Sequence, residues 1–389
     1  MSVCAPRGFA ASGVAAGIKG GAALDLALVA VDPPGPVAGA ATFTTNKAAA
    51  APVQVSRAHL AATGGRVAAV LLNSGCANAA TGAEGLRAAQ RSAEAVATLL
   101  GVGADEVLVC STGLIGPRLP VELVESASPA LVGGLGRTRG DAARAAEAIL
   151  TTDTHAKEVV IERDGFCVGG MAKGAGMIAP RMATMLAVLT TDASVAPDLL
   201  ARSLKGAVEE SFNQLTVDGC TSTNDTVVAM ASGLGAAVPA GELDEALGEA
   251  CRRLALQLAE DAEGTTRVAR VRVTGARSVD EARRAARAVA ESNLVKTSLH
   301  GADPYWGRVL SELGASGSSI DVGRVRISYG ATLVFADGLE VPHDRRAASA
   351  YLSRGLVEVT CDLGLGEGAA TVLTTDLGPG YIEENMRTS

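Results

Sequence analysis

Short apolar runs alternate with glycine-rich turns along the first half of the chain. Val67–Leu72 and Glu106–Cys110 are runs typical of buried strands, and each is followed by a loop of Gly, Ser and Thr. Between them, from Ala83 to Leu100, apolar residues recur at helical spacing, and Gly101 is expected to end this helix. The same reading predicts a helix over 141–149 and a strand over 157–161.

The second half of the chain shows the same alternation of predicted helices and strands. Helices are predicted over 197–213, 243–260 and 278–291, and strands near 268–273, 325–328, 331–335 and 357–362. The Gly/Arg-rich segment Gly133–Gly140 is expected to join two helices. Helices and strands therefore interleave throughout, which predicts a mixed α/β or α+β fold in which helices cover sheets.

Composition narrows the class of protein. The chain has 389 residues, of which 48% are hydrophobic and 20% charged, so it can bury a sizeable core and is not a disordered chain. At about 150 residues per domain, this length fits two to three domains or two closely packed halves. Aromatic residues make up only 3%, so Ala, Val, Leu and Ile must build the core. The net charge of −8, without a long basic run, argues against a nucleic-acid or anionic-membrane partner.

The seven cysteines are scattered without CxxC spacing, which favours reduced thiols over disulfides or a zinc site. Cys76, Cys110 and Cys220 lie in polar loops and are interpreted as small packed residues. The first residues lack the pattern of a signal peptide, and the longest apolar stretch is interrupted by Pro180 and Arg181. We therefore expect a soluble, cytoplasmic protein.

Gly169–Asp192 is the most unusual stretch, with four glycines around Lys173 and the pair Ala183-Thr184 before an apolar run. One interpretation is a phosphate loop, although the GxxxxGK[ST] spacing is absent. A second is a tight turn that leads into a buried strand and leaves Lys173 in solvent. A third is a masked nucleophile, in which Thr184 becomes N-terminal by cleavage of the chain.

A threonine hydroxyl is a poor nucleophile without an adjacent base. An N-terminal threonine carries that base as its own α-amine, whose pKa of about 7.7–8.0 allows proton exchange near neutral pH. None of the four histidines lies in a GxSxG, HExxH or similar frame: they are His59, His155, His300 and His343. Nothing in the sequence points to a histidine-dependent hydrolase.

Five further loops carry polar groups among glycines or at strand ends: 72–78, 110–116, 151–154, 217–226 and 261–265. Each alone is typical of a turn or a helix cap, but five together favour a substrate-binding surface. The segment Lys296–Arg308 has two interpretations. It is either a structured loop anchored by Trp306 or the rim of a substrate site or subunit contact.

Nine motifs, in order, give the sequence a close resemblance to the ornithine acetyltransferase family, the bifunctional glutamate N-acetyltransferases of arginine biosynthesis. They cover nearly the whole chain: Gly13–Lys19, Asn73–Asn78, Ser111–Gly116, Thr151–Asp153, Lys173–Asp192, Ser222–Thr226, Ala262–Gly264, Lys296–Arg308 and Tyr381–Asn385.

The resemblance implies a precursor that cleaves itself between Ala183 and Thr184 into an α chain, 1–183, and a β chain, 184–389. Thr184 would accept the acetyl group of N2-acetylornithine and pass it to glutamate in a ping-pong cycle through an acetyl-Thr ester. The implied fold is a layered sandwich of helices and sheets, similar to that of N-terminal-nucleophile enzymes. The implied assembly is an α2β2 heterotetramer.

The resemblance also assigns roles to individual residues. Thr112 and Gly113 would form the oxyanion hole. The amino-acid substrate would be bound by Thr151, Lys173, Thr184, Glu263, Asn385 and Ser389. No metal or resident cofactor is implied, and acetyl-CoA is an alternative acetyl donor.

Three positions depart from the family pattern. Arg181 replaces the usual Asn or Ser and bears on the rate of processing, Cys220 replaces a frequent Asp, and the tail ending at Ser389 is one residue short. Two other functions stay open from the residues alone. One is hydrolysis by an amidase or aminopeptidase with the same nucleophile, and the other is a non-catalytic ligand-binding or assembly protein with an uncleaved chain.

Overall fold

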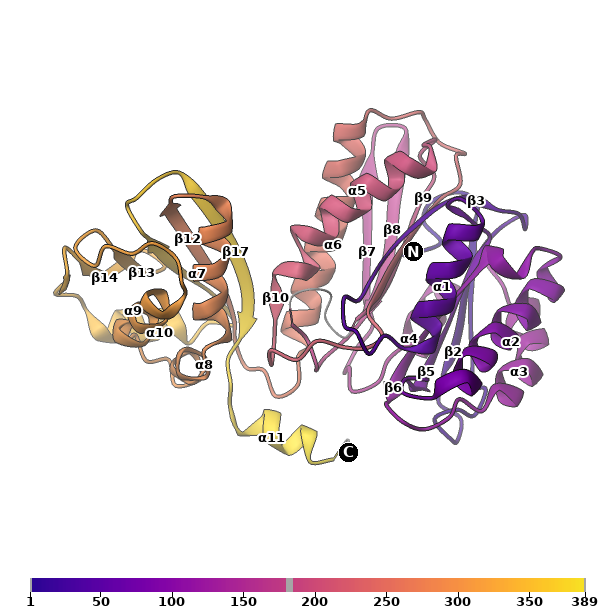
Figure 1. Ribbon diagram of the computed structural model, residues 1–389, viewed down its shortest axis with the longest axis horizontal. Coiled ribbons are helices and arrows are strands. Elements are labelled where there is room, and N and C mark those ends of the chain that lie inside the picture. The colour runs from indigo at the N-terminus through magenta and orange to yellow at the C-terminus, as the bar shows by residue number, and fades with distance from the viewer. Residues whose placement is uncertain (1, 180–184, 388–389) are drawn as a thin grey trace. The chain divides into compact units, whose positions relative to one another are not determined.

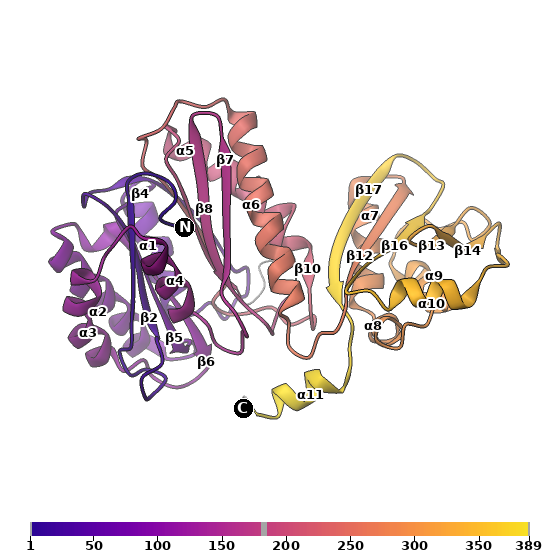
Figure 2. The same ribbon diagram turned by 180° about the vertical axis from the view of Figure 1, so that it is seen from behind.

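The computed structural model describes residues 2–179 and 185–387, which form two compact units (Figures 1 and 2). The first comprises residues 1–213 and 221–258, and the second residues 214–220 and 259–389. Both combine helices with sheets in layers, which confirms the predicted fold class. The division between the units does not follow the expected processing point, because the strands on either side of residues 183–184 lie in one sheet of the first unit.

The first unit contains a four-stranded sheet whose side chains point alternately into two hydrophobic cores. Its order is β1 (Phe9–Val14), β2 (Leu26–Val31), β5 (Ala69–Cys76) and β6 (Val107–Leu114). Successive strand residues point to opposite faces, so Leu26 and Leu28 of β2 join one core while Ala27 and Val29 join the other. Both faces are buried, which explains why β2 is a continuous apolar run.

Helices cover both faces of this sheet. Helices α1 (Ala51–Ala62), α2 (Gly82–Leu100) and α3 (Val121–Gly133) supply residues to the core of one face, and α4 (Arg139–Ala148) supplies residues to the other. Helix α2 ends as predicted: Gly101 adopts a left-handed φ of 71° and its N–H donates to the carbonyl of Ala97. The Gly/Arg-rich segment joins α3 to α4, also as predicted.

A second sheet of the first unit holds the strands around the expected processing point. Its order is β4 (Arg66–Val67), β3 (Val37–Phe43), β11 (Thr226–Ala231), β9 (Leu186–Thr191), β8 (Phe166–Lys173) and β7 (Lys157–Arg163). Strand β9 is antiparallel to β8 and parallel to β11. Helices α5 (Pro197–Glu209) and α6 (Ala240–Glu260) pack on this sheet (Figure 2). The packing of α6 on β8 is close, because a Cβ atom added to Gly170 would lie 3.3 Å from Leu254 of α6.

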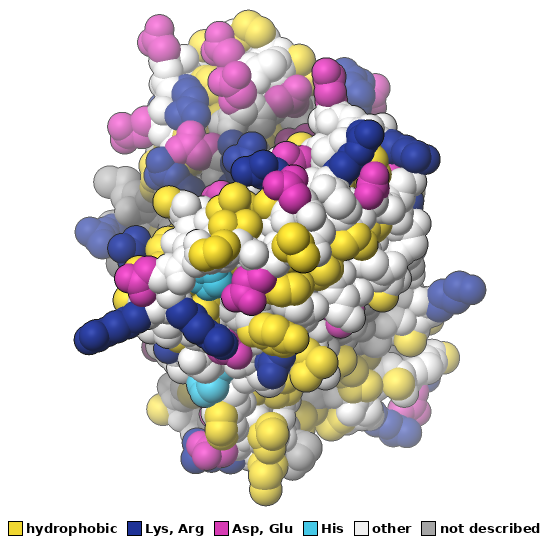
Figure 3. All heavy atoms as spheres, turned by 90° about the vertical axis from the view of Figure 1, so that its left-hand side faces the viewer, with side chains coloured by type: hydrophobic (Ala, Val, Ile, Leu, Met, Phe, Trp, Pro, Cys, Tyr) yellow, Lys and Arg dark blue, Asp and Glu magenta, His cyan; other side chains and the backbone are white. Residues whose placement is uncertain are grey.

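The second unit is built on one seven-stranded sheet. Its order is β10 (Leu215–Thr216), β17 (Gly368–Thr375), β12 (Val268–Ala276), β16 (Leu356–Asp362), β13 (Arg326–Tyr329), β14 (Thr332–Ala336) and β15 (Leu339–Glu340). Its helices are α7 (Val279–Glu291), α8 (Asn293–His300), α9 (Trp306–Ala315), α10 (Arg345–Leu352) and α11 (Pro379–Asn385). Short 3-10 turns cover Ala104–Glu106 in the first unit and Phe212–Gln214 at the boundary. Figure 3 shows hydrophobic side chains gathered on the face of the molecule that it draws. Leu339 is one of the exposed hydrophobic residues of the second unit.

Two expectations about loops are wrong. Lys296–Arg308 is not one loop, because α8 continues to His300 and α9 begins at Trp306. The anchoring role of Trp306 is nevertheless confirmed, since its ring lies 4.6 Å from that of Phe335 between centroids.

The polar segments after Leu72 and Cys110 are also not loops. They continue β5 and β6, because the parallel pairing of these strands extends from Ala69 and Val107 to Cys76 and Leu114. Backbone pairing thus overrides the turn preference of Asn73 and Ser111. Among the residues that the structure describes, no helix is long and apolar enough to span a membrane.

Candidate functional site

The polar ends of β5 and β6 meet the loop before β11 in the first unit. The side-chain amide of Asn224 donates to the carbonyls of Ala77, at 2.7 Å, and Ser111, at 2.9 Å. The Ser111 hydroxyl donates to Asn73 Oδ1 at 2.5 Å, which links the two strands. Three motifs from distant parts of the sequence are therefore joined by buried hydrogen bonds.

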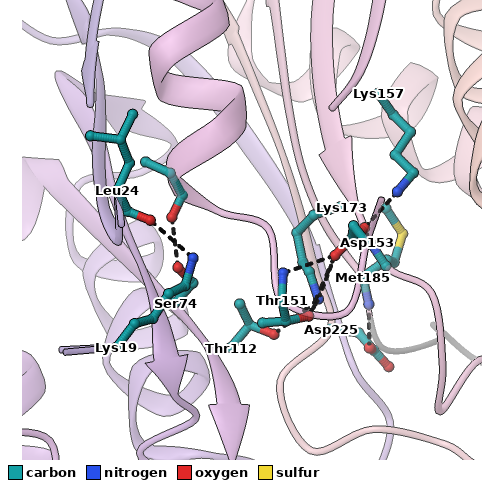
Figure 4. A network of polar contacts seen from close by, with 12 residues as sticks. Lys19, Leu24, Ser74, Thr112, Thr151, Asp153, Lys157, Lys173, Met185 and Asp225 are labelled. Carbon is teal, nitrogen blue, oxygen red and sulfur yellow. Dashed lines mark hydrogen bonds and ion pairs between the residues drawn. The ribbon is translucent and has the colours of Figure 1, made fainter. Parts of the chain in front are cut away.

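Lys173, the last residue of β8, brings three of the predicted site residues together (Figure 4). Its Nζ donates to Thr112 Oγ1 at 3.3 Å and to Thr151 Oγ1 at 2.5 Å. The side chain is 2% exposed, so the interpretation in which Lys173 is solvated is wrong. A buried ammonium that contacts hydroxyls is suited to bind a carboxylate.

Asp153 holds this cluster in place. Its Oδ2 lies 3.5 Å from Lys173 Nζ and accepts from the Thr151 N–H at 3.0 Å, while its Oδ1 accepts from Lys157 Nζ at 2.6 Å. Burial opposes ionisation of this carboxyl, but the charges of Lys173 and Lys157 outweigh it and hold the pKa of Asp153 well below its usual range. Asp153 is therefore the fixed negative charge that orients Lys173.

Asp225 lies next to the expected processing point. Its Oδ1 accepts from the backbone N–H of Met185 at 3.1 Å, and its side chain is fully buried (Figure 4). Ala183 and Thr184, the predicted cleavage residues, lie outside the described residues, as do Arg181 and Ser389.

Gly113 fills a position in β6 that no other residue fits. Its φ is +132°, and a Cβ atom there would lie 2.3 Å from the carbonyl carbon of Gly75 on the paired strand. Thr112, its neighbour, is buried. A hydroxyl and a backbone N–H on adjacent residues of a rigid strand are the groups that an oxyanion hole uses.

Two other predicted residues meet in the second unit. Asn385 of α11 donates through Nδ2 to Glu263 Oε2 at 2.9 Å. This contact depends on Gly264, where a Cβ atom would lie 2.0 Å from the backbone nitrogen of Tyr381 and would force α11 away. The sequence motifs 262–264 and 381–385 are thus parts of one local structure.

The cysteine interpretation holds in part. Cys76 and Cys110 are buried, and burial raises the pKa of Cys110 to about 12, which makes it an inert packed residue. The interpretation of Cys220 as packed is wrong, because Cys220 is exposed in the loop before β11.

Sequence reasoning missed four functional candidates: Asp153, Lys157, Asn224 and Asp225. Three of them stand inside motifs that the sequence had marked, but nothing in the pattern assigned them a role. Lys157 gave one usable signal in the sequence, because it stands at the start of an apolar strand. The structure buries it fully, and a fully buried lysine needs a charged partner.

Comparisons with known proteins identify the family of this chain. The ArgJ family model matches residues 10–388. The arginine biosynthesis bifunctional protein ArgJ of Mycolicibacterium paratuberculosis is 49% identical, over 99% of this chain and 96% of its own.

Two solved structures are also similar. ArgJ of Bacillus halodurans is 35% identical, with a TM-score of 0.49, over 51% of this chain and 96% of its own. Ornithine acetyltransferase of Mycobacterium tuberculosis, solved in complex with ornithine, is 48% identical, with a TM-score of 0.44, over 46% of this chain and 94% of its own. The match to the family model and the full-length relative show that this chain belongs to the ArgJ family.

Proposed function

We propose that this protein transfers an acetyl group from N2-acetylornithine to glutamate through an acetyl ester on Thr184. The observation that carries this proposal is the buried cluster of Lys173, Thr112 and Thr151 in the same unit as Met185, the residue after Thr184. Membership of the ArgJ family supports it, because the curated relative is named for a bifunctional role in arginine biosynthesis.

The proposed cycle begins with self-cleavage between Ala183 and Thr184, which frees the α-amine of Thr184. This amine removes the hydroxyl proton as Oγ attacks the acetyl carbonyl of N-acetylornithine. The C–N bond breaks, ornithine leaves with a proton on its amine, and the acetyl group stays on Oγ. Glutamate then attacks the ester through its amine, which yields N-acetylglutamate and restores the hydroxyl.

Thr112 and Gly113 are proposed to stabilise the oxyanion in both half-reactions. A Thr hydroxyl and a Gly N–H are suited to this because each can donate a hydrogen bond to the developing negative charge. The contact of Thr112 with Lys173 Nζ supports this role, since the hydroxyl oxygen accepts from the lysine and keeps its own hydrogen free to donate.

Lys173 is proposed to bind the α-carboxylate that both amino-acid substrates share, with Thr151 beside it. Glu263 and Asn385 are proposed to bind an amino group of the substrate, and Ser389 to contribute a further contact. We propose that acetyl-CoA serves as an alternative acetyl donor and that no metal takes part. The proposed assembly is α2β2, with a native mass of twice that of one precursor.

The decisive experiment incubates the purified protein with N-acetylornithine and glutamate and quantifies ornithine, N-acetylglutamate and free acetate. Transfer predicts equal amounts of ornithine and N-acetylglutamate, and no product from Thr184→Ala, which should stay uncleaved. Acetate formed in place of N-acetylglutamate would show a hydrolase. An uncleaved wild type without turnover would favour the non-catalytic protein.

A further inference from the structure

Strand β6 is the edge strand of its four-stranded sheet, and only β5 pairs with it. The backbone groups of successive residues in such a strand face alternately toward the neighbouring strand and away from it. At the two ends of β6, the carbonyls of Glu106 and Leu114 accept from the N–H groups of Ala68 and Ala77 on the β5 side, at 2.8 and 3.1 Å. The even-numbered residues therefore face β5, and the odd-numbered residues face away from it.

Side chains from outside the sheet bond to this outer row of backbone groups. The Ser56 hydroxyl of α1 accepts from the N–H of Val109 at 2.8 Å and donates to its carbonyl at 2.7 Å. The next outward carbonyl, that of Ser111, accepts from Asn224 Nδ2 at 2.9 Å. The following outward position is Gly113, so its N–H points to the same side of β6 as the Asn224 amide.

Asn224 is buried and fixed from several directions. It is 4% exposed, and Nδ2 donates to the carbonyls of both Ser111 and Ala77, the second at 2.7 Å. A carbonyl can only accept, so the nitrogen of the amide must face these two groups. The Thr223 hydroxyl donates to Oδ1 at 2.6 Å, and the Thr223 carbonyl accepts from the Ala50 N–H at 2.9 Å. The amide is thus held rigidly against the end of β6.

The Asn224 amide takes the place of half of a missing strand. In a parallel ladder, a partner residue beside Thr112 would donate to the carbonyl of Ser111 and accept from the N–H of Gly113. Asn224 makes the first of these two hydrogen bonds. Because the peptide between Ser111 and Thr112 is planar, this bond also fixes the plane from which Thr112 extends. The accepting place beside the Gly113 N–H is the one that an oxyanion would fill.

We propose that Asn224 is a positioning residue, which holds the end of β6 so that the Thr112 hydroxyl and the Gly113 N–H aim at the oxyanion of acetyl transfer. Asn224 acts through these two groups and does not itself contact the substrate. The inference rests on the proposed function, in which Thr112 and Gly113 form the oxyanion hole.

Two substitutions separate positioning from a general loss of stability. Asn224→Ala removes the donor shared by Ser111 and Ala77. Ser56→Ala is the matched control, because Ser56 is also fully buried and its hydrogen bonds are made to the same outer edge of β6, two residues earlier. Both variants should melt at a lower temperature than the wild type, since each leaves buried backbone groups unpaired. Only Asn224→Ala should disturb the oxyanion donors.

The measurement is steady-state kinetics of acetyl transfer from N-acetylornithine to glutamate, with the cleaved enzyme quantified by intact mass. We expect kcat of Asn224→Ala to fall about 10- to 100-fold, because removal of one oxyanion donor costs about 100-fold or more and displacement of both is comparable. The KM for each substrate should stay within about two-fold of wild type, because oxyanion stabilisation acts in the transition state. Ser56→Ala should keep kcat within about two-fold of wild type.

Equal kcat values for Asn224→Ala and Ser56→Ala would overturn the inference, and so would an effect confined to KM. A folded Asn224→Ala that stays uncleaved would also contradict it, since the proposed role belongs to the transfer that follows cleavage. Thermal unfolding checks that the variants are folded, and if Asn224→Ala is not, Asn224→Ser, which keeps one donor, decides by the same criteria. A wild type that transfers no acetyl group would instead overturn the proposed function.

Discussion

At the scale of single residues, the site depends on charges that are held out of water. Lys173 and Lys157 share the carboxylate of Asp153, and all three side chains are at most 2% exposed. Such a cluster is expensive to bury, and its cost is offset only when the geometry of each contact is good. The 2.6 Å contact of Lys157 with Asp153 meets that condition, and Lys173, whose Nζ lies 3.5 Å from Asp153, is oriented toward the two threonines.

Replacing Lys173 with methionine tests its role as the carboxylate ligand. We expect kcat/KM for N-acetylornithine to fall about 10- to 100-fold, because a hydrogen bond to a charged group contributes about 1.5–3 kcal/mol. Lys205→Met, on an exposed position of α5, is the matched control and should retain full activity. Steady-state kinetics measures both, and unchanged kcat/KM for Lys173→Met would remove this residue from the site.

At the scale of elements, the close approach of β5 and β6 sets the geometry of the proposed oxyanion hole. Gly113→Ala should lower the melting temperature and abolish acetyl transfer, because its Cβ would overlap the backbone of Gly75. Gly116→Ala is the control: its φ of +105° is also unfavourable for alanine, but nothing lies within 4 Å of the added atom. Equal melting temperatures and activities for the two variants would show that the strand contact is unimportant.

A second element-scale prediction concerns Asp376, which follows β17 in the second unit. Its carboxylate accepts from Thr266 Oγ1 at 2.6 Å and lies 2.7 Å from His300 Nδ1, tying β17 to α8 and to the segment before β12. Burial opposes ionisation, but the Thr266 hydroxyl and His300 outweigh it and lower the pKa of Asp376. The ionised group therefore stabilises the folded state above its unfolded pKa of about 3.9, and this contribution is lost as the pH falls through the lowered value.

Asp376→Asn should accordingly reduce the free energy of unfolding by about 2 kcal/mol at pH 7. The difference from wild type should shrink as the pH is lowered below about 4. Urea unfolding over this pH range measures both effects, with the exposed Asp321→Asn as a control that should change little. A difference that does not vary with pH would assign the loss to packing rather than to charge.

At the scale of the whole molecule, the expected processing point lies between two neighbouring strands of one sheet. Strand β9 pairs with β8, from the proposed α chain, along six residue pairs from Val168–Thr191 to Lys173–Leu186. It also pairs with β11, from the same proposed β chain as β9. Cutting the connection leaves every one of these hydrogen bonds in place.

The two fragments should therefore stay together after cleavage. They should coelute in size-exclusion chromatography under native conditions and separate only in denaturant. Fragments that separate without denaturant would contradict the pairing of β8 with β9.

The sequence predicted much of this architecture and only part of the site. Helix α2 and strand β16 were placed to within one residue, because their buried positions follow a clear period. Strand β1 was missed, since FAASGV is rich in small residues whose burial comes from packing against α4. Asp153 and Asp225 could not be assigned because a buried carboxyl group has no period, and its partners are set by the fold.

Acetyl transfer through Thr184 is tested most directly by an intact-mass measurement, under denaturing conditions, on protein briefly exposed to N-acetylornithine. Acetyl transfer through Thr184 predicts two fragments, residues 1–183 and 184–389. The second should carry one acetyl group that disappears when glutamate is added. A single 39.0 kDa species, or a cleaved protein whose second fragment is never acetylated, would contradict the proposed function.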